Sequence, residues 1–161
     1  MTVEAASYRR TLGRFATGVA VVAMEVGDEL RAMTVNSFTS VSLEPPLVLF
    51  CAGKSSKMGE FSSQASGFSV SILGRDQRDV SSHFAGIPVA AGTPPFGFVT
   101  WDEGVRLEGC CAALLCARHA VFDGGDHWIV VGRVVATYEA PPDDDPLLYY
   151  RGQYRRLEDV P

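Results

Sequence analysis

Hydroxyl side chains crowd one short stretch of this sequence, residues 34–42. Five of these nine positions carry a hydroxyl: Thr34, Ser37, Thr39, Ser40 and Ser42. Two prolines then break the chain, and the next five residues, 47–51, are continuously apolar, which predicts a strand buried on both faces. Hydroxyl and backbone N–H groups beside a core require hydrogen-bond partners. The stretch therefore forms either a turn that bonds its own backbone or a site for an acceptor-rich ligand.

The residues after the apolar run favour a ligand with a phosphate, such as a flavin. Lys54 and Lys57 are the only lysines of the chain, and they flank Ser55 and Ser56 at the start of a helix predicted over 56–65. The unpaired N–H groups and partial positive charge of a helix N-terminus suit a phosphate. The alternative is an ordinary serine N-cap with solvated lysines.

A second candidate for chemistry is the pair Asp126 and His127. A tight turn at 123–126 leads into a β-branched run at 128–138, so the histidine stands where a strand begins. A histidine in that place can hydrogen-bond a ligand, and the neighbouring carboxylate can orient its ring. The alternative is a turn aspartate followed by a histidine that the backbone satisfies.

The elements that must position these residues are mostly strands. The apolar patterns predict strands at 19–26, 30–35, 47–51, 67–73, 105–122 (broken by Gly109) and 128–138. Helices are expected over 4–17, 56–65 and 75–85; in the first, Tyr8, Leu12 and Phe15 form one apolar stripe. We expect loops at 86–95 and 141–146, a short strand or ordered loop at 96–101, and a closing segment at 147–157. Hairpin-like connections dominate, which indicates an antiparallel barrel with Greek-key connections.

Composition narrows the class of protein. The chain has 161 residues and a mass of 17.3 kDa, which predicts one domain over 1–161. Its net charge of −5 argues against a nucleic-acid partner. No apolar run reaches the length of a membrane span, and the N-terminus lacks the basic and apolar pattern of a secretory signal. The sequence therefore predicts a cytoplasmic globular protein.

The positions of the cysteines favour reduced thiols in the hydrophobic core. Cys51, Cys110, Cys111 and Cys116 all lie in or beside apolar runs, which fits free thiols better than a disulfide framework. The last three, with His119, raise the possibility of zinc, but they lack a Cys-x-x-Cys pair, so we predict no metal. The chain also lacks the Gly-x-Gly-x-x-Gly pattern of a Rossmann nucleotide site and the motif of a serine nucleophile elbow.

Four segments together resemble the short-chain flavin reductases, the small reductase components of two-component flavin monooxygenases. The segments are 34–49 (TVNSFTSVSLEPPLVL), 68–86, 125–134 and 146–154. They stand in the family's order, and the likeness extends over roughly residues 8–157. Four ordered matches are far more specific than one short motif. The sequence departs from the family at Tyr150, where a histidine is frequent.

The resemblance implies a mainly β, FMN-binding split barrel with a few short helices, and a homodimer whose interface helps form the cofactor pocket. It implies hydride transfer from NADH or NADPH to FMN or FAD, with reduced flavin passing to a partner monooxygenase. Two other interpretations stay open. One is a flavin-binding protein without reductase activity, such as a carrier, and the other is a β-barrel interaction module without a cofactor.

The resemblance also assigns roles to individual residues. His127 would be the catalytic residue, on the nicotinamide side of the flavin. Phe84 would pack either against the cofactor or in the core. The full set of expected cofactor-binding residues is Thr34, Val35, Asn36, Ser37, Ser40, Val41, Ser42, Cys51, Ala52, Ser55, Ser56, Lys57, Phe61, Phe84, Asp126, Tyr150 and Tyr154.

Overall fold

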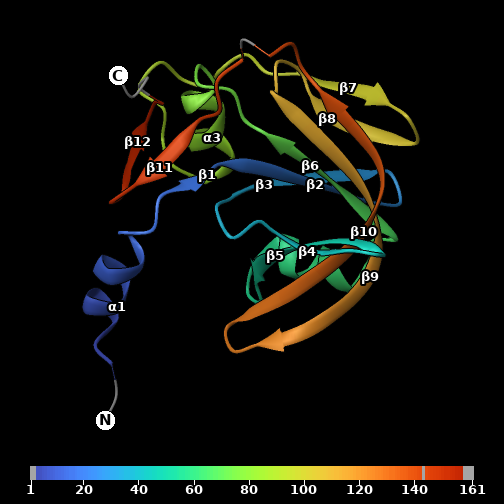
Figure 1. The fold of residues 1–161 in the computed structure, drawn as a ribbon, viewed down its shortest axis with the longest axis horizontal. Helices are drawn as coiled ribbons and strands as arrows, with labels where there is room; N and C mark the ends of the chain where they lie inside the picture. The colour runs from blue at the N-terminus through green and yellow to red at the C-terminus, as the bar shows by residue number, and fades with distance from the viewer. Residues whose placement is uncertain (1–2, 143, 158–161) are drawn as a thin grey trace.

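The structure is a computed structural model that describes residues 3–142 and 144–157 (Figure 1). Most of these residues form strands. The helices are α1 (Ala5–Leu12), α2 (Lys57–Gln64) and α3 (Arg78–Phe84). The strands are β1 (Thr17–Gly18), β2 (Ala20–Val26), β3 (Glu29–Val35), β4 (Thr39–Leu43), β5 (Pro46–Gly53), β6 (Gly67–Ile72), β7 (Phe98–Trp101), β8 (Gly104–Leu107), β9 (Ala112–Gly124), β10 (His127–Glu139), β11 (Leu148–Tyr150) and β12 (Gln153–Arg155).

A seven-stranded antiparallel sheet organises the molecule, in the order β3-β2-β6-β9-β10-β5-β4. The hairpins β2–β3, β4–β5 and β9–β10 supply half of its neighbouring pairs, while β6 pairs with β2 and β9 and so joins the first hairpin to the last. Strands β3 and β4 form the two edges, so the sheet is an open barrel rather than a closed one. The expectation of a mainly β split barrel with a few short helices is confirmed.

The long hairpin β9–β10 is bent, and its strands take part in both halves of the barrel (Figure 1). Its register shifts twice, between Val131 and Gly132 and between Val134 and Ala136. Such irregularities increase local bend and twist. A Cβ on Gly132 would lie 2.4 Å from the Phe68 ring, so only glycine lets β10 pass this close to the core.

Two apolar clusters lie on opposite faces of the sheet. The first includes Val22, Phe50 and Val130 and is covered by Met58 and Phe61 of α2. The second lies beneath α3, the β7–β8 hairpin and the C-terminal strands. Its buried members are Val19, Val21, Leu73, Val80, Leu107, Cys110, Ala113 and Leu147.

The four cysteines are free thiols. Cys110 and Cys116 are buried, while Cys51 and Cys111 are half-buried. Burial raises the pKa of the Cys116 thiol to about 12. Among the described residues, no three His, Cys, Asp or Glu side chains gather where they could hold a metal ion. Within 3–142 and 144–157, no helix is long and apolar enough to cross a bilayer.

The first helix is shorter than the sequence predicts and less buried. It ends at Leu12 because Gly13 forms its C-cap, and the Gly13 carbonyl accepts a hydrogen bond from the Arg151 N–H. The predicted apolar stripe is exposed: Tyr8 is 58%, Leu12 54% and Phe15 77% accessible. Helix α1 projects away from the sheet (Figure 1) and buries none of its residues against the rest of this chain.

Other boundaries also differ from the expectation. Strand β5 is not buried on both faces, because burial alternates along it with Val48, Phe50 and Ala52 facing the core. The hydroxyl-rich residues 39–43 form the edge strand β4. The strand predicted at 105–122 with a break at Gly109 forms two strands, β8 and β9, and the break at Glu108–Cys111 contains that glycine, as predicted. The helix predicted at 75–85 is α3, which begins at Arg78.

The other predicted elements agree with the structure more closely. The hairpin at 19–35, the strands at 67–73 and 128–138 and the helix at 56–65 form within a few residues of their predicted bounds. Residues 86–95 form neither helix nor strand, as predicted. The loop predicted at 141–146 includes position 143, which lies outside the described residues.

Candidate functional site

The C-terminal end of β5 brings the main candidate residues together. Gly53 pairs with His127 across the β5–β10 ladder. The next residue, Lys54, donates its backbone N–H to the Asp126 carbonyl at 3.0 Å. Helix α2 begins three residues later. The turn before β10 therefore lies directly beside the start of α2, so two segments that are distant in sequence share one site.

Ser56 is the N-cap of α2. Its Oγ accepts from the Gly59 N–H at 3.0 Å and donates to the Gly53 carbonyl at 2.7 Å. The hydroxyl therefore has a donor and an acceptor within the protein, as the N-cap interpretation expects. Ser55 is exposed beside it. At this end of the helix, Ser55 and the N–H groups of the first turn are the groups that can meet a phosphate.

The two lysines have different surroundings. Lys54 forms an ion pair with Asp123, and its ammonium lies 4.5 Å from the centre of the Trp128 ring. Hydrogen bonding from Lys54, with a smaller contribution from the Gly125 N–H, lowers the pKa of Asp123. Lys57 pairs with Glu60, one turn along α2, at 3.0 Å and is mostly exposed. Lys54 thus ties the β9–β10 turn to the start of α2, whereas Lys57 points into solvent.

Asp126 and His127 form a pair at the exposed rim of this site. Nδ1 of His127 lies 2.7 Å from Oδ1 of Asp126, and this hydrogen bond is the main reason that the pKa of Asp126 is lowered. Nε2 of the same ring lies 3.9 Å from the position of a Cβ added to Gly53. Because the carboxylate engages Nδ1, Nε2 is the ring nitrogen that remains for a ligand beside Gly53.

The hydroxyl-rich stretch is tied to the same strand. The Ser37 hydroxyl accepts from the Cys51 N–H at 2.9 Å, which places residues 36–38 against the middle of β5. Thr34 donates its hydroxyl to the Ser81 carbonyl at 2.7 Å. Some hydroxyls thus bond the protein itself, as the turn interpretation expects. Asn36 and Ser40 are exposed.

A groove of about 1010 Å³ runs between α1 and residues 36–39. Its walls include Phe15, Asn36, Tyr149 and Arg151. The Thr17 hydroxyl also lines it and is buried without a hydrogen-bond partner among the described residues. Amide, hydroxyl, aromatic and guanidinium groups together fit a large, polar, aromatic ligand with phosphate groups, and a flavin is such a ligand.

The remaining predicted residues lie on the other side of β3 or in the core. Tyr154 bonds the Ser81 hydroxyl at 2.9 Å, and Phe84 packs against Phe96 with ring centres 4.8 Å apart. Tyr150 lies beneath the Arg151 guanidinium at 5.3 Å. The bond between Thr34 and Ser81 joins Tyr154 and α3 to β3.

Burial limits what several of these residues can do. Val35, Ala52 and Phe61 are core residues, so they support the site from beneath. Val41 is half exposed on β4, while Ser42 and Cys51 are half-buried there and on β5. The ligand contacts assigned to all these residues stay predictions.

Three residues of the site did not appear among the sequence candidates: Lys54, Asp123 and Trp128. They form one connected group, because Lys54 pairs with the aspartate and lies over the indole. The sequence carried a partial indication, since Lys54 directly precedes Ser55 and the turn that contains Asp123 precedes Trp128. Only the β5–β10 pairing reveals that the two ends meet.

An open, mainly β barrel with a polar site at one end of the sheet defines the class of flavin-binding split barrels. Comparison with known families gives the more specific assignment: residues 12–158 match the family model described as "Flavin reductase like domain". The chain belongs to this family.

Named relatives and solved structures agree. The chain is 42% identical, over 94% of its length and 95% of the relative's, to the reductase component of 4-hydroxyphenylacetate 3-monooxygenase from Thermus thermophilus. The flavin reductase PheA2 superposes with a TM-score of 0.91 at 32% identity, covering 98% of this chain and 100% of that one. The NADH:FAD oxidoreductase SgcE6 of Streptomyces globisporus C-1027, in complex with NAD and FAD fragments, superposes with a TM-score of 0.86 at 36% identity, covering 98% and 97%.

Proposed function

We propose that this protein is an NAD(P)H-dependent flavin reductase that supplies reduced FMN or FAD to a partner monooxygenase. The observation that carries the proposal is the meeting of three groups around the end of β5. These are the start of α2, residues 36–37 and the Asp126–His127 pair. The family assignment and the named functions of the relatives support the same reaction.

The reaction is hydride transfer from a nicotinamide to a flavin ring, and the two cofactors supply its chemistry. The protein's contribution is to hold both rings in reach of each other, which converts an encounter of two molecules into a positioned step. The exposed amide and hydroxyls of 36–42 would bond the polar edge of the flavin. Ser55 and the first N–H groups of α2 would meet its phosphate.

His127 would act on the nicotinamide side. Its Nδ1 is held by Asp126, so the ring keeps one orientation and presents Nε2 beside Gly53. A hydrogen bond to Nε2 of such a fixed ring can position the carboxamide of a nicotinamide over the flavin. This role predicts an effect on nucleotide use rather than on flavin affinity.

The protein would act as a homodimer. Helix α1 has only eight residues and buries none of them, and such a short helix is marginal without a partner surface. On the edge strand β4, Val41 and Leu43 are 50% and 94% exposed. Unpaired edges and apolar residues of this kind are normally covered. A second copy of the chain would cover both surfaces.

Cellular context completes the proposal. The four free thiols fit a reducing compartment, and a flavin reductase draws on the nicotinamide pool there, so we place the protein in the cytoplasm. The competing function is that of a flavin carrier, which would keep the β5-end site without using NADH or NADPH.

Nucleotide oxidation tests the central proposal. We expect the purified protein to oxidise NADH or NADPH, followed by absorbance, only when FMN or FAD is present. Titration of flavin fluorescence measures flavin binding separately. Flavin binding without nucleotide oxidation would favour the carrier, and the absence of flavin binding would contradict both functions.

Two histidines provide a matched test of the nicotinamide side. His127→Ala should lower kcat/KM for the nucleotide by roughly tenfold to a hundredfold, the size of effect expected for lost positioning, with flavin affinity little changed. His119→Ala is the control, because His119 is exposed on β9 outside the site. Equal nucleotide kinetics in both variants would remove His127 from this role.

Light scattering tests the dimer. Leu12→Glu combined with Leu43→Glu places charges on the two exposed apolar surfaces and should convert a dimer into a monomer. Ile87→Glu is the control, since Ile87 is 53% exposed in the loop 86–95. A wild-type protein with the mass of a single chain would contradict the proposal.

A further inference from the structure

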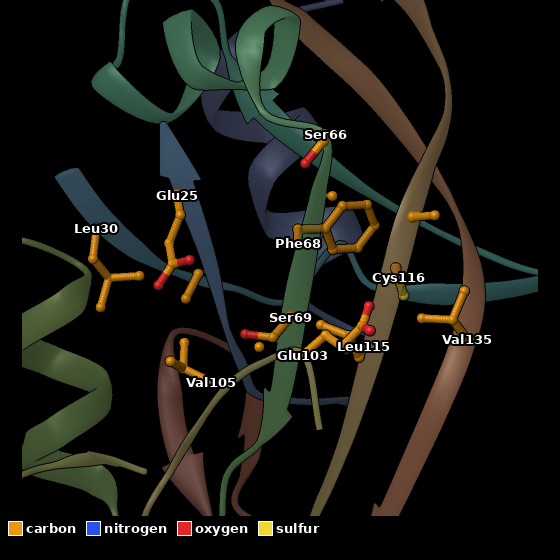
Figure 2. A pocket seen from close by; sticks show the side chains of 14 residues that line it. Glu25, Leu30, Ser66, Phe68, Ser69, Glu103, Val105, Leu115, Cys116 and Val135 are labelled. Carbon is orange, nitrogen blue, oxygen red and sulfur yellow. The ribbon is translucent and has the colours of Figure 1, made fainter. Parts of the chain in front are cut away.

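A second cavity lies at the opposite end of β3 from the candidate cofactor site. It has a volume of about 410 Å³ and opens between the sheet and the β7–β8 hairpin (Figure 2). We call it the Ser69 pocket. Its lining residues are Ala23, Glu25, Leu30, Ser66, Gly67, Phe68, Ser69, Glu103, Gly104, Val105, Leu115, Cys116, Ala117 and Val135. Leu30 and Thr34 are four positions apart, which is about 13 Å along a strand.

Two serines on one face of β6 have different hydrogen bonding. Ser71 accepts the Leu107 N–H at 3.0 Å, so β8 satisfies its hydroxyl. Ser69 lies one pleat away on the same face and is only 3% exposed. Its hydroxyl has no hydrogen-bond partner among residues 3–142 and 144–157. A buried hydroxyl in this state costs free energy unless a ligand or water meets it.

Close contacts join the strands that form the walls of the pocket. A Cβ on Gly104 would lie 2.5 Å from Leu115, so the end of the β7–β8 hairpin rests directly on β9. A Cβ on Gly67 would lie 2.4 Å from the Cys116 carbonyl oxygen, so β6 and β9 are equally close. The contact between β6 and β9 is therefore made by backbone atoms, whereas that between β8 and β9 is made through the Leu115 side chain.

The charges that line the pocket are of one sign. Glu25 and Glu103 contribute two carboxylates, while lysine, arginine and histidine are absent from the lining. Neither glutamate forms an ion pair within the part of the chain that the structure describes. Figure 2 shows the Glu25 carboxylate and the Ser69 hydroxyl on the same side of β6. Carboxylates beside an apolar wall attract a cation more strongly than they would in open water.

The rest of the surface is apolar. Leu30, Val105, Leu115 and Val135 supply aliphatic walls. A pocket of this size, mostly apolar with a few polar groups, is typical of small-molecule sites. An inorganic cation would leave this apolar surface uncovered. The lining thus matches a ligand that joins a positive charge to a hydrocarbon body.

We propose that the Ser69 pocket binds a small organic cation, namely an amine with an apolar body. The ammonium group lies between Glu25 and the Ser69 hydroxyl, which then gains its missing partner. The hydrocarbon part packs against Leu30, Val105 and Leu115. The site does not depend on the proposed reductase activity, because it shares no lining residue with the end of β5.

Benzylamine, benzyl alcohol and benzoate form a suitable set of probes, because they share an aromatic body and differ in charge. Titration into the isotope-labelled protein, followed by NMR, should give saturable shifts at Gly67, Ser69 and Gly104 with benzylamine in the millimolar range. Benzyl alcohol should bind about tenfold more weakly, and benzoate should cause no shifts there. Shifts elsewhere only, or equal binding of alcohol and amine, would overturn the proposal.

Two variants test whether the Glu25 carboxylate and the Ser69 hydroxyl bind the ammonium group. Glu25→Gln should weaken benzylamine binding by about tenfold, since it removes one carboxylate and keeps the side-chain shape. Ser69→Ala should weaken it by about threefold to tenfold, the loss expected for one hydrogen bond. Glu139→Gln, an exposed carboxylate on β10 outside the pocket, is the control and should bind as the wild type does. Unchanged affinity in Glu25→Gln would overturn the proposal.

Discussion

The two ends of β3 carry two sites that differ in how their polar groups are satisfied. At the Thr34 end, three side chains bond one another or the backbone: Thr34 with Ser81, Ser37 with Cys51, and Asp126 with His127, while the Thr17 hydroxyl nearby lacks a partner among the described residues. At the Leu30 end, the Ser69 hydroxyl has no partner among the described residues. Glu25 and Glu103 form no ion pair there either.

This difference shows two ways of preparing a surface for a ligand. In the candidate cofactor site, internal hydrogen bonds fix the loops and leave exposed groups and a helix N-terminus to meet the ligand. The loops are therefore ordered before the ligand binds, so binding costs less conformational entropy. This favours high affinity and precise placement of the ligand. In the Ser69 pocket, the polar groups themselves remain incomplete. Substitution of a group that is bonded within the first site should therefore affect folding, whereas substitution of Ser69 should affect ligand binding and leave folding intact.

Alanine substitution of two glycines should give the largest contrast in stability. A Cβ on Gly59 would lie 2.3 Å from the Gly53 carbonyl oxygen, a backbone atom that cannot move unless the end of β5 shifts. Gly59→Ala should lower the free energy of unfolding by about 3 kcal/mol, as overpacking does, and weaken flavin binding because α2 must shift. Urea unfolding and flavin titration measure the two effects.

Gly104→Ala is the matched change at the other end. There the nearest atom to the added Cβ is Leu115 Cδ1 at 2.5 Å, the end of a flexible side chain. The cost should stay below about 1 kcal/mol, with flavin binding unchanged. If the two variants were equally stable, the rigid contact between α2 and β5 would not be the feature that distinguishes the sites.

Two serine-to-alanine changes should move stability in different directions. Ser56→Ala removes the N-cap of α2 and should cost about 1 kcal/mol. Ser69→Ala removes a buried hydroxyl that has no partner in the described structure, so it should be neutral or stabilising. Thermal or urea unfolding of both variants checks the pair. A loss of stability in Ser69→Ala comparable to that of Ser56→Ala would mean that the hydroxyl does have a partner in solution.

Much of the candidate site follows from the sequence because its parts are local. The hydroxyl-rich residues 34–42, the serine at the start of α2 and the Asp126-His127 turn are each short patterns, and the structure brings parts of all three to the end of β5, while their ligand contacts stay predictions. The β-branched run after His127 likewise predicts β10. The family resemblance then supplied the fold, since the order of the four segments is a property of the whole chain.

What the sequence did not predict depends on packing between distant segments. The contact of Lys54 with Asp123 requires the pairing of β5 with β10, which no local pattern contains. The stripe of Tyr8, Leu12 and Phe15 was correctly seen as apolar, but its exposure depends on where Gly13 ends the helix. The Ser69 pocket was missed altogether. Strand β8 gives the Ser71 hydroxyl a hydrogen-bond partner and leaves the Ser69 hydroxyl without one, and the course of β8 cannot be read from the sequence around the two serines.

Substitution of Ser55 and Lys57 should have a smaller effect, and it tests the phosphate site separately from the N-cap Ser56. Ser55→Ala combined with Lys57→Ala should weaken flavin binding about threefold to tenfold, the loss of one or two exposed hydrogen bonds or charges. Stability should hardly change, because Ser55 and Lys57 are exposed and the N-cap is Ser56. Fluorescence quenching of the flavin measures affinity, with Ser63→Ala, an exposed serine further along α2, as control. An unchanged affinity would remove both residues from the phosphate site.

The smallest expected effect concerns the pairing of Lys54 with Asp123, which lies at the surface. The pKa of Asp123 is lowered below its ordinary value of 3.8, chiefly by hydrogen bonding from Lys54. A carboxyl whose pKa is lower in the folded state adds stability above its unfolded pKa and loses that contribution as the pH falls through its folded pKa. The wild type should thus be slightly more stable than Asp123→Asn at neutral pH, and the difference should shrink as the pH falls below 3.8 and vanish once the pH lies below the lowered pKa of the folded state. Urea unfolding at several pH values measures this difference, and a difference that persisted in acid would show that Asp123 acts through packing rather than charge.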